Sequence, residues 1–212
     1  HNREHLIQLL NTILSTGKLP KAWKLATVVE IYKGKGSPTD PEMYRPISLL
    51  PTAYKIFARI LQTRLEHTID HKIRPTQFGF RKNRSTSQPI HIVRRLIESA
   101  ESHSDTLYSL FLDWEKAFDK IHPQAITASL RRFGVQPEFT RIIDHFYSNP
   151  QFKVLSTGKP SQVHTAHSGI KQGCPLSPYL FLVVHSAIMH DVTQLMTDND
   201  TRALPTIHSQ FT

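Results

Sequence analysis

An aspartate at the end of an apolar run is the clearest candidate in this sequence for a residue with a chemical role. Residues 106–113 read TLYSLFLD and predict a strand that is buried on both faces and presents Asp113 at its last position. A buried carboxylate is costly unless a cation or hydrogen bonds compensate its charge, and a divalent metal is one such cation. The alternative for Asp113 is a helix cap or a salt bridge. Asp119 follows six residues later and is expected to cap or position the next helix.

A basic segment in the first quarter of the chain has the composition of a phosphate-binding hairpin. Residues 28–50 read VVEIYKGKGSPTDPEMYRPISLL, in which a predicted strand leads to Lys33 and Lys35, a glycine- and proline-containing loop, and then Arg45. A planar guanidinium fork together with one or two lysine point charges suits a triphosphate. The alternatives are a solvated turn for the lysines and a structural ion pair for Arg45.

A glycine-containing turn precedes the last predicted helix. Residues 168–181 read SGIKQGCPLSPYLF, so backbone amides and the amide side chain of Gln172 are expected where a nucleotide and its template base would lie. Gly173 gives the backbone of this turn its conformational freedom. The alternative is a glycine-bearing loop that serves only to lead into a packed helix.

Charge is distributed unevenly along the 212 residues. Residues 1–100 contain 17 basic and 7 acidic residues, whereas residues 101–212 contain 9 and 10. This asymmetry indicates one region that meets phosphates and another that holds chemistry, although a surplus of solvated lysines explains it equally well. The single cysteine excludes an internal disulfide and favours an intracellular, reducing compartment, and no apolar run is long enough to cross a membrane.

The elements that must position these residues follow from apolar spacing and from glycine and proline punctuation. Helices are predicted at residues 6–14, 53–69, from about 85 to 97 and beyond, 123–134, 137–146 and 177–196, and strands at 25–32, 106–113, 151–156 and 162–168. The fold class is therefore mixed α+β. No internal repeat or linker divides the chain.

Four motifs occur in a fixed order, namely YRPISLL, QFGFRKNRST, LFLDWEKAFDKI and GIKQGCPLSPYLF. Together they resemble the reverse transcriptase domain of non-LTR (LINE-like) retrotransposons over nearly the whole chain. Group II intron reverse transcriptases are similar, but AFDKI and QGCPLSP are closer to the retrotransposon version. The resemblance implies the fingers and partial palm of a right-hand polymerase over residues 1–212, with an incomplete palm sheet and no thumb. Residues 1–105 would be rich in fingers elements and residues 106–212 in palm elements.

The resemblance also implies a role for individual residues. Asp113 would be the first catalytic aspartate, and Trp114 would offer its backbone carbonyl to the same metal. Two Mg²⁺ ions would then activate a DNA primer and neutralise the leaving pyrophosphate during RNA-templated addition of deoxynucleoside triphosphates. Phe118 would exclude a 2′-hydroxyl from the incoming nucleotide, and its alternative is an ordinary core phenylalanine.

Further positions match the nucleotide and template contacts of the same family. Lys33 and Arg45 would hold the triphosphate, while Gln172 and Gly173 would contact the nucleotide and the template strand. Three residues of the second motif, Gln77, Gly79 and Arg81, would contact the template.

One family motif has no counterpart in this sequence. Members of the family carry a later hairpin with a Tyr/Phe-Ala-Asp-Asp turn, and no Asp-Asp pair occurs here. We therefore expect this chain to be a piece of a longer polymerase and to be inactive alone. The resemblance also implies an intracellular location, in the nucleus and cytoplasm. The alternatives are a non-catalytic nucleic-acid-binding remnant of a retroelement and a group II intron-type reverse transcriptase or maturase. The sequence leaves the oligomeric state open.

Overall fold

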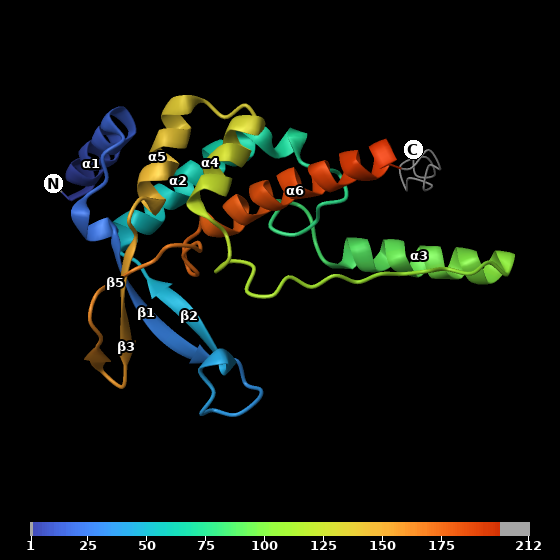
Figure 1. The fold of residues 1–212 in the computed structure, drawn as a ribbon. Coiled ribbons are helices and arrows are strands. Elements are labelled where there is room, and N and C mark those ends of the chain that lie inside the picture. The colour runs from blue at the N-terminus through green and yellow to red at the C-terminus, as the bar shows by residue number, and fades with distance from the viewer. Residues whose placement is uncertain (1, 200–212) are drawn as a thin grey trace.

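Helices and a small sheet make up the body of the protein, and a long arm projects from it (Figure 1). The computed structural model describes residues 2–199. The helices are α1 (Asn2–Thr16), α2 (Thr52–Ile69), α3 (Ser87–His103), α4 (Pro123–Arg132), α5 (Pro137–Tyr147) and α6 (Ser177–Asn199). The strands are β1 (Leu25–Tyr32), β2 (Tyr44–Leu49), β3 (Gln151–Ser156), β4 (Lys159–Pro160) and β5 (His164–Thr165). The predicted α+β class and all six predicted helices are confirmed.

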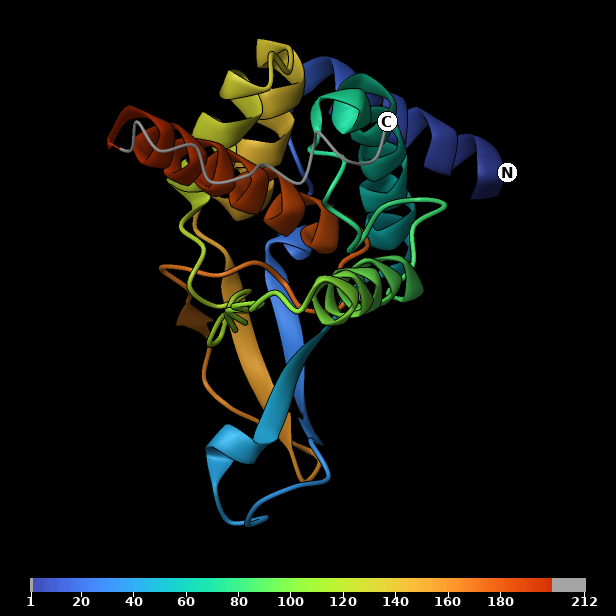
Figure 2. The same ribbon diagram turned by 90° about the vertical axis from the view of Figure 1, so that its right-hand side faces the viewer.

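The sheet has the strand order β2-β1-β3-β4, and β5 pairs with β3. β1 and β2 are antiparallel, with Ile31 opposite Arg45, whereas β1 and β3 are parallel. Parallel neighbours require a long crossover, and here the chain passes through α2, α3, α4 and α5 between them. The sheet therefore joins strands that are far apart in the sequence. Figure 2 shows it as a blade below the helices, with the loop that follows β1 at its tip.

The second strand of this blade is absent from the sequence-based prediction. β2 lies in the YRPISLL motif, where the proline and the short length give a weak strand signal. Backbone hydrogen bonds to β1 stabilise β2 as a strand although its local strand propensity is weak. The predicted hairpin after residue 151 forms, with short return strands at β4 and β5.

The core is centred on one face of α2. Its buried side chains recur every three or four residues, as expected for an amphipathic helix. They are Tyr54, Phe57, Ala58, Leu61, Gln62, Leu65 and Ile69. Trp23 and Phe146 complete an aromatic cluster with Tyr54 and Phe57, in which ring centroids lie 5.0 to 5.9 Å apart. The first turns of α6 pack on the same core, and α4 contacts both α5 and α6.

The predicted strand at residues 106–113 is wrong. These residues have no regular secondary structure and are exposed to solvent, with Tyr108, Leu110 and Phe111 each more than four-fifths exposed. A strand buried on both faces needs neighbouring strands for its backbone groups and packed layers for its side chains. Within residues 2–199 no strand pairs with this segment. The apolar side chains of this segment therefore remain exposed, because no described strand pairs with it.

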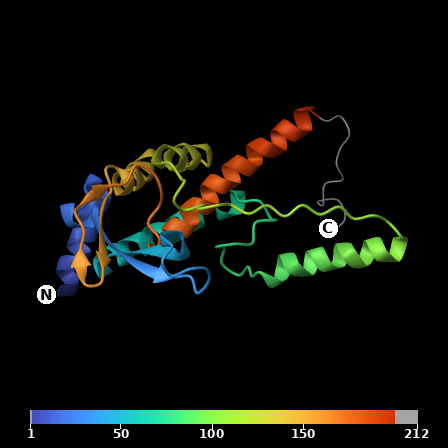
Figure 3. The same ribbon diagram turned by 60° about the horizontal axis from the view of Figure 1, so that its bottom comes forward.

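This segment and α3 form the projecting arm, which we define as residues 87–113. α3 buries none of its residues, and Ser104 adopts a left-handed conformation that reverses the chain at the tip. Figure 3 shows the arm extending away from the sheet and from α1. Across the part of the chain that is described, no helix combines the length and apolarity that a bilayer crossing requires.

Candidate functional site

The loop before α6 is bound to two other parts of the chain. Residues 168–173 contact residues 118–121 on one side and β2 on the other. The hydrogen bonds are Ile170 N to Phe118 O at 2.8 Å, Gly169 N to Ile121 O at 2.7 Å, Ser168 Oγ to Asp119 O at 3.0 Å, and Ser48 N to Gln172 O at 2.7 Å. We call this the loop junction. It brings together pieces of all three chemical clusters that the sequence singled out.

Two glycines allow this close approach. Gly173 has a φ of +105°, and a Cβ atom there would lie 2.9 Å from the carbonyl oxygen of Ser48. Gly169 has a φ of +93°, and its Cβ would lie 3.2 Å from the backbone of Asp119. Both the backbone conformation and the contact distance exclude larger side chains. The predicted need for a glycine at Gly173 therefore has a concrete cause.

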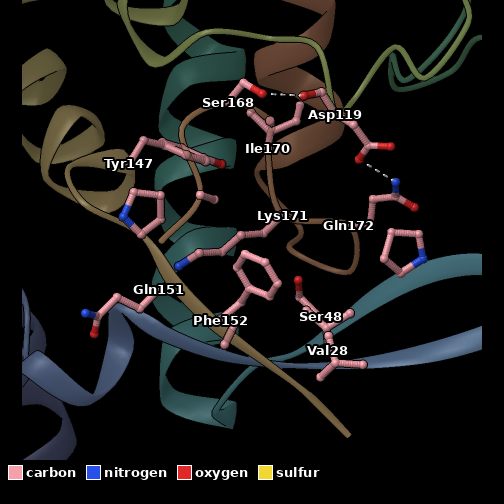
Figure 4. Close-up of a pocket in the computed structure, with 16 residues that line it drawn as sticks. Val28, Ser48, Asp119, Tyr147, Gln151, Phe152, Ser168, Ile170, Lys171 and Gln172 are labelled. Atoms are coloured by element: carbon pink, nitrogen blue, oxygen red, sulfur yellow. Dashed lines mark hydrogen bonds between the residues drawn. The ribbon is translucent and has the colours of Figure 1, made fainter. Parts of the chain in front are cut away.

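The side chain of Gln172 is oriented by a carboxylate. Its Nε2 atom donates a hydrogen bond of 3.0 Å to Oδ1 of Asp119 (Figure 4). The amide oxygen of Gln172 is then available as an acceptor for a ligand. Asp119 was expected only to cap or position a helix, and its contact with Gln172 was missed. The two residues are 53 positions apart, so no local pattern could have revealed it.

Phe118 lies in a group of aromatic rings between the loop junction and α6. Its ring stacks on that of Phe181, with centroids 5.3 Å apart, and Phe80 meets it edge-on at 6.2 Å. The ring of His185 also stacks on that of Phe181. Burial, together with the charge of nearby Arg74, lowers the pKa of His185. Phe118 is partly buried, so the packing accounts for its position, and its role in sugar selection stays a prediction.

Two cations of the basic hairpin differ in their contacts: Lys33 is hydrogen-bonded within the hairpin, whereas Arg45 has no side-chain partner among the described residues. Lys33 donates from Nζ to the carbonyl oxygen of Glu42 at 2.6 Å and so helps to close the hairpin loop. Lys116 forms an ion pair of 2.7 Å with the carboxylate of Glu42. Arg45 is exposed, and its guanidinium makes no hydrogen bond or ion pair with the described residues. The guanidinium of Arg45 is therefore available to a ligand.

Asp113 lies at the base of the arm, outside the loop junction. Its side chain is exposed and has no hydrogen-bond or ion-pair partner among residues 2–199. Next to it, the Trp114 ring meets His185 of α6 edge-on, with centroids 5.7 Å apart. Within the same residues, no three His, Cys, Asp or Glu side chains lie together as metal ligands. Asp113 therefore does not form a metal site with the groups described.

Arg81 is occupied by a structural contact. Its guanidinium binds both carboxylate oxygens of Asp70, at 3.0 and 2.8 Å, and the backbone carbonyls of Asp70, Arg74 and Gln77. Only 7% of the Arg81 side chain is exposed. These hydrogen bonds lower the pKa of the Asp70 carboxyl and raise the pKa of Arg81. Arg81 thus anchors its loop to the end of α2, and the neighbouring Gln77 side chain bonds to Gly79 of the same loop.

Lys171 places a positive charge inside the protein. Its Nζ atom lies 3.3 Å from the carbonyl oxygen of Trp23 and 5.0 Å from the ring centre of Tyr54. No carboxylate among the described residues contacts it. Burial lowers the pKa of Lys171 to about 8, with Cys174 acting in the opposite direction and the charge of Lys24 adding to the decrease. Nothing in the sequence pattern singled out this lysine.

Comparison with known proteins gives a consistent family. Residues 32–204 match the family model described as "Reverse transcriptase (RNA-dependent DNA polymerase)". The chain is 33% identical over 186 residues to the RNA-directed DNA polymerase from mobile element jockey of Drosophila melanogaster, covering 86% of this chain and 20% of that protein. It is 30% identical over 184 residues to the Pol polyprotein of retrotransposable element R2DM of the same species, covering 87% and 17%.

A solved structure shares the fold. Apo telomerase from Candida tropicalis, truncated from its C-terminal domain, superposes with a TM-score of 0.57 at 14% identity, covering 89% of this chain and 44% of that one. The chain spans about a fifth of the length of the first curated relatives it matches.

Replacing Arg81 by glutamine should destabilise the protein by about 1–3 kcal/mol, because the Asp70 carboxylate loses its cation. Since the folded pKa of Asp70 lies below its ordinary value of 3.8, this stabilisation is complete above that value and is lost as the pH falls through the folded pKa. Urea unfolding at pH 7 and near pH 3 measures both effects. Lys82→Gln, on an exposed neighbour, is the control, and equal losses in both variants would refute the anchoring role.

Replacing Lys171 by methionine should stabilise the protein. A shift of the pKa from 10.5 to about 8 means that the buried ammonium opposes folding by up to about 3 kcal/mol below pH 8. Between pH 8 and 10.5 the folded chain loses this proton first, so the advantage of methionine should shrink as the pH rises. Thermal unfolding at pH 7 and pH 10 tests this. A lower melting temperature for Lys171→Met at pH 7 would contradict it.

Proposed function

We propose, because the chain belongs to the reverse transcriptase (RNA-dependent DNA polymerase) family, that it is the nucleotide-binding part of an RNA-directed DNA polymerase of a non-LTR retrotransposon. The single observation that carries this proposal is the loop junction. There the backbone of β2, the segment that follows Asp113 and the loop before α6 are held together by hydrogen bonds.

The loop junction has the groups that a nucleotide requires. Gln172, held by Asp119, presents an amide oxygen, and Gly173 leaves the backbone accessible without a side chain. Arg45 lies on β2, three positions before Ser48, whose backbone is bonded to the loop. We assign Arg45 to the triphosphate, with Lys33 as a secondary contact, and Phe118 to the sugar. Residues 1–105 would then be rich in fingers elements and residues 106–212 in palm elements.

Reverse transcriptases use divalent metal ions, and we propose Mg²⁺ for this protein. The described residues do not fit a complete metal site, because no three His, Cys, Asp or Glu side chains among them lie together as possible ligands. We therefore assign this chain one metal-binding carboxylate, with the Trp114 carbonyl beside it. We further propose that residues 106–113 become a strand when a neighbouring strand of a longer protein pairs with them. Their exposed apolar side chains support this, since pairing and burial would satisfy both backbone and side chains.

The proposed partners are an RNA template, a DNA primer and deoxynucleoside triphosphates. The excess of basic over acidic residues in the first half of the chain supports contact with phosphates. Gln77 and Gly79 remain candidates for template contact. Arg81 is the weakest of the three, because its donors are already engaged by Asp70 and by backbone carbonyls.

Arg45→Ala should weaken binding of a fluorescent deoxynucleoside triphosphate by about tenfold or more, because a charge-assisted contact contributes about 1.5–3 kcal/mol. Arg64→Ala, an exposed arginine on α2, removes the same charge elsewhere and is the matched control. Fluorescence anisotropy at fixed ionic strength measures both. If the two variants lose affinity equally, general electrostatics accounts for binding and Arg45 has no specific role.

Asp113→Ala in a longer protein that contains this chain should reduce primer extension on poly(rA) with Mg²⁺ by about a thousandfold, which equals about 4 kcal/mol of barrier. Asp105→Ala, an exposed aspartate at the other end of the same segment, should leave extension near normal. RNA binding without any extension in the unaltered longer protein would instead favour the non-catalytic remnant.

A further inference from the structure

A cavity of about 250 Å³ lies behind the loop junction, between strands β1 and β3 and residues 166–172 (Figure 4). Most of its wall is apolar, and the contributing side chains include Val28, Pro150, Phe152, Val154 and Ile170. Its volume suits a single ring with a short chain rather than a nucleotide.

Lys171 is the principal charged group in this apolar space. Figure 4 shows its side chain crossing the cavity, with Nζ on the side of Tyr147 and Gln151. Two hydroxyl-bearing rings are nearby, Tyr54 and Tyr147, and burial raises the pKa of both, so both are neutral at pH 7. The remaining titratable neighbours are Lys24, which adds positive charge, and the buried thiol of Cys174.

The cavity therefore contains an ammonium group that forms no ion pair with a carboxylate among the described residues. Among the residues that line it, Asp119 has the one carboxylate, and that carboxylate is exposed and accepts a hydrogen bond from Gln172. An unpaired buried ammonium opposes folding, and such groups in cavities are typical of binding sites rather than of structural cores. A bound anion would restore the missing charge balance while its apolar part fills the space.

We propose that this cavity binds a small apolar molecule with one anionic group, such as an aryl-alkyl carboxylate, and that Lys171 is the counter-ion. The apolar body lies against Val28, Phe152 and Val154. The cavity shares Gln172 with the proposed nucleotide site, but Arg45 and Lys33, the proposed triphosphate contacts, do not line it. Binding in the cavity does not depend on polymerase activity. Because Lys171 precedes Gln172 directly, an occupied cavity also restricts the loop junction.

The test compares 4-phenylbutyrate with the neutral 4-phenylbutanamide, which has the same shape. Titration into the chain at pH 7, followed by ¹H–¹⁵N NMR, should show the acid binding about tenfold tighter than the amide. Lys171→Met should remove this preference, whereas Lys18→Met, on an exposed loop, should retain it. Affinity for the acid should also fall as the pH rises above about 8, when the ammonium loses its proton.

A second variant tests the cavity independently of the charge. Val154→Phe introduces a ring from β3 and should abolish binding of both compounds while leaving the amide signals of α4 unchanged, since no residue of α4 lines the cavity. The proposal is overturned if the acid does not bind, if acid and amide bind equally, or if Lys171→Met leaves the preference intact. Since Lys171→Met is expected to be more stable than the natural chain, loss of preference in that variant does not reflect unfolding.

Discussion

The hydrogen bonds of the loop junction are the constraint on which the rest of the site depends. The backbone of residues 168–173 is tied to residues 118–121 and to β2, three segments that the chain visits at widely separated positions. Gly169 and Gly173 make the approach possible, because a side chain at either position would meet backbone atoms. Once these strands and loops are joined, the position of Gln172 relative to Arg45 is set by backbone geometry, and flexible side chains contribute little to it.

The basic residues of this protein divide into three kinds that composition alone does not distinguish. Arg81 is consumed by Asp70 and by backbone carbonyls, so its charge serves the fold. Arg45 is exposed and unengaged among the described residues, so its charge is available to a ligand. Lys171 is half-buried without a carboxylate partner among the described residues. Its lowered pKa reflects the free energy required to bury the ammonium group. The basic residues that can bind a ligand are those whose hydrogen-bond donors are not already engaged by the protein.

The arm illustrates how a local pattern can require a non-local partner. Residues 106–113 have the apolar composition of an internal strand, yet strand hydrogen bonds must come from another segment. Without such a segment among residues 2–199, the backbone stays extended and the rings of Tyr108 and Phe111 face solvent. No group of three potential metal ligands forms among the described residues either, so the proposed metal site and the proposed strand both require contacts that these residues do not supply.

Periodicity and punctuation determined the six helices, β1 and β3, and the order of four motifs determined the family, because both kinds of pattern can be read along the chain without tertiary contacts. Tertiary structure alone decided that β2 pairs with β1, that Asp119 orients Gln172 across 53 positions, that Arg81 is buried against Asp70, and that Lys171 enters a cavity. It also decided that residues 106–113 are exposed. Each of these features depends on contacts between segments that are far apart in the sequence. The energies of such contacts cannot be predicted from a local pattern of residue types.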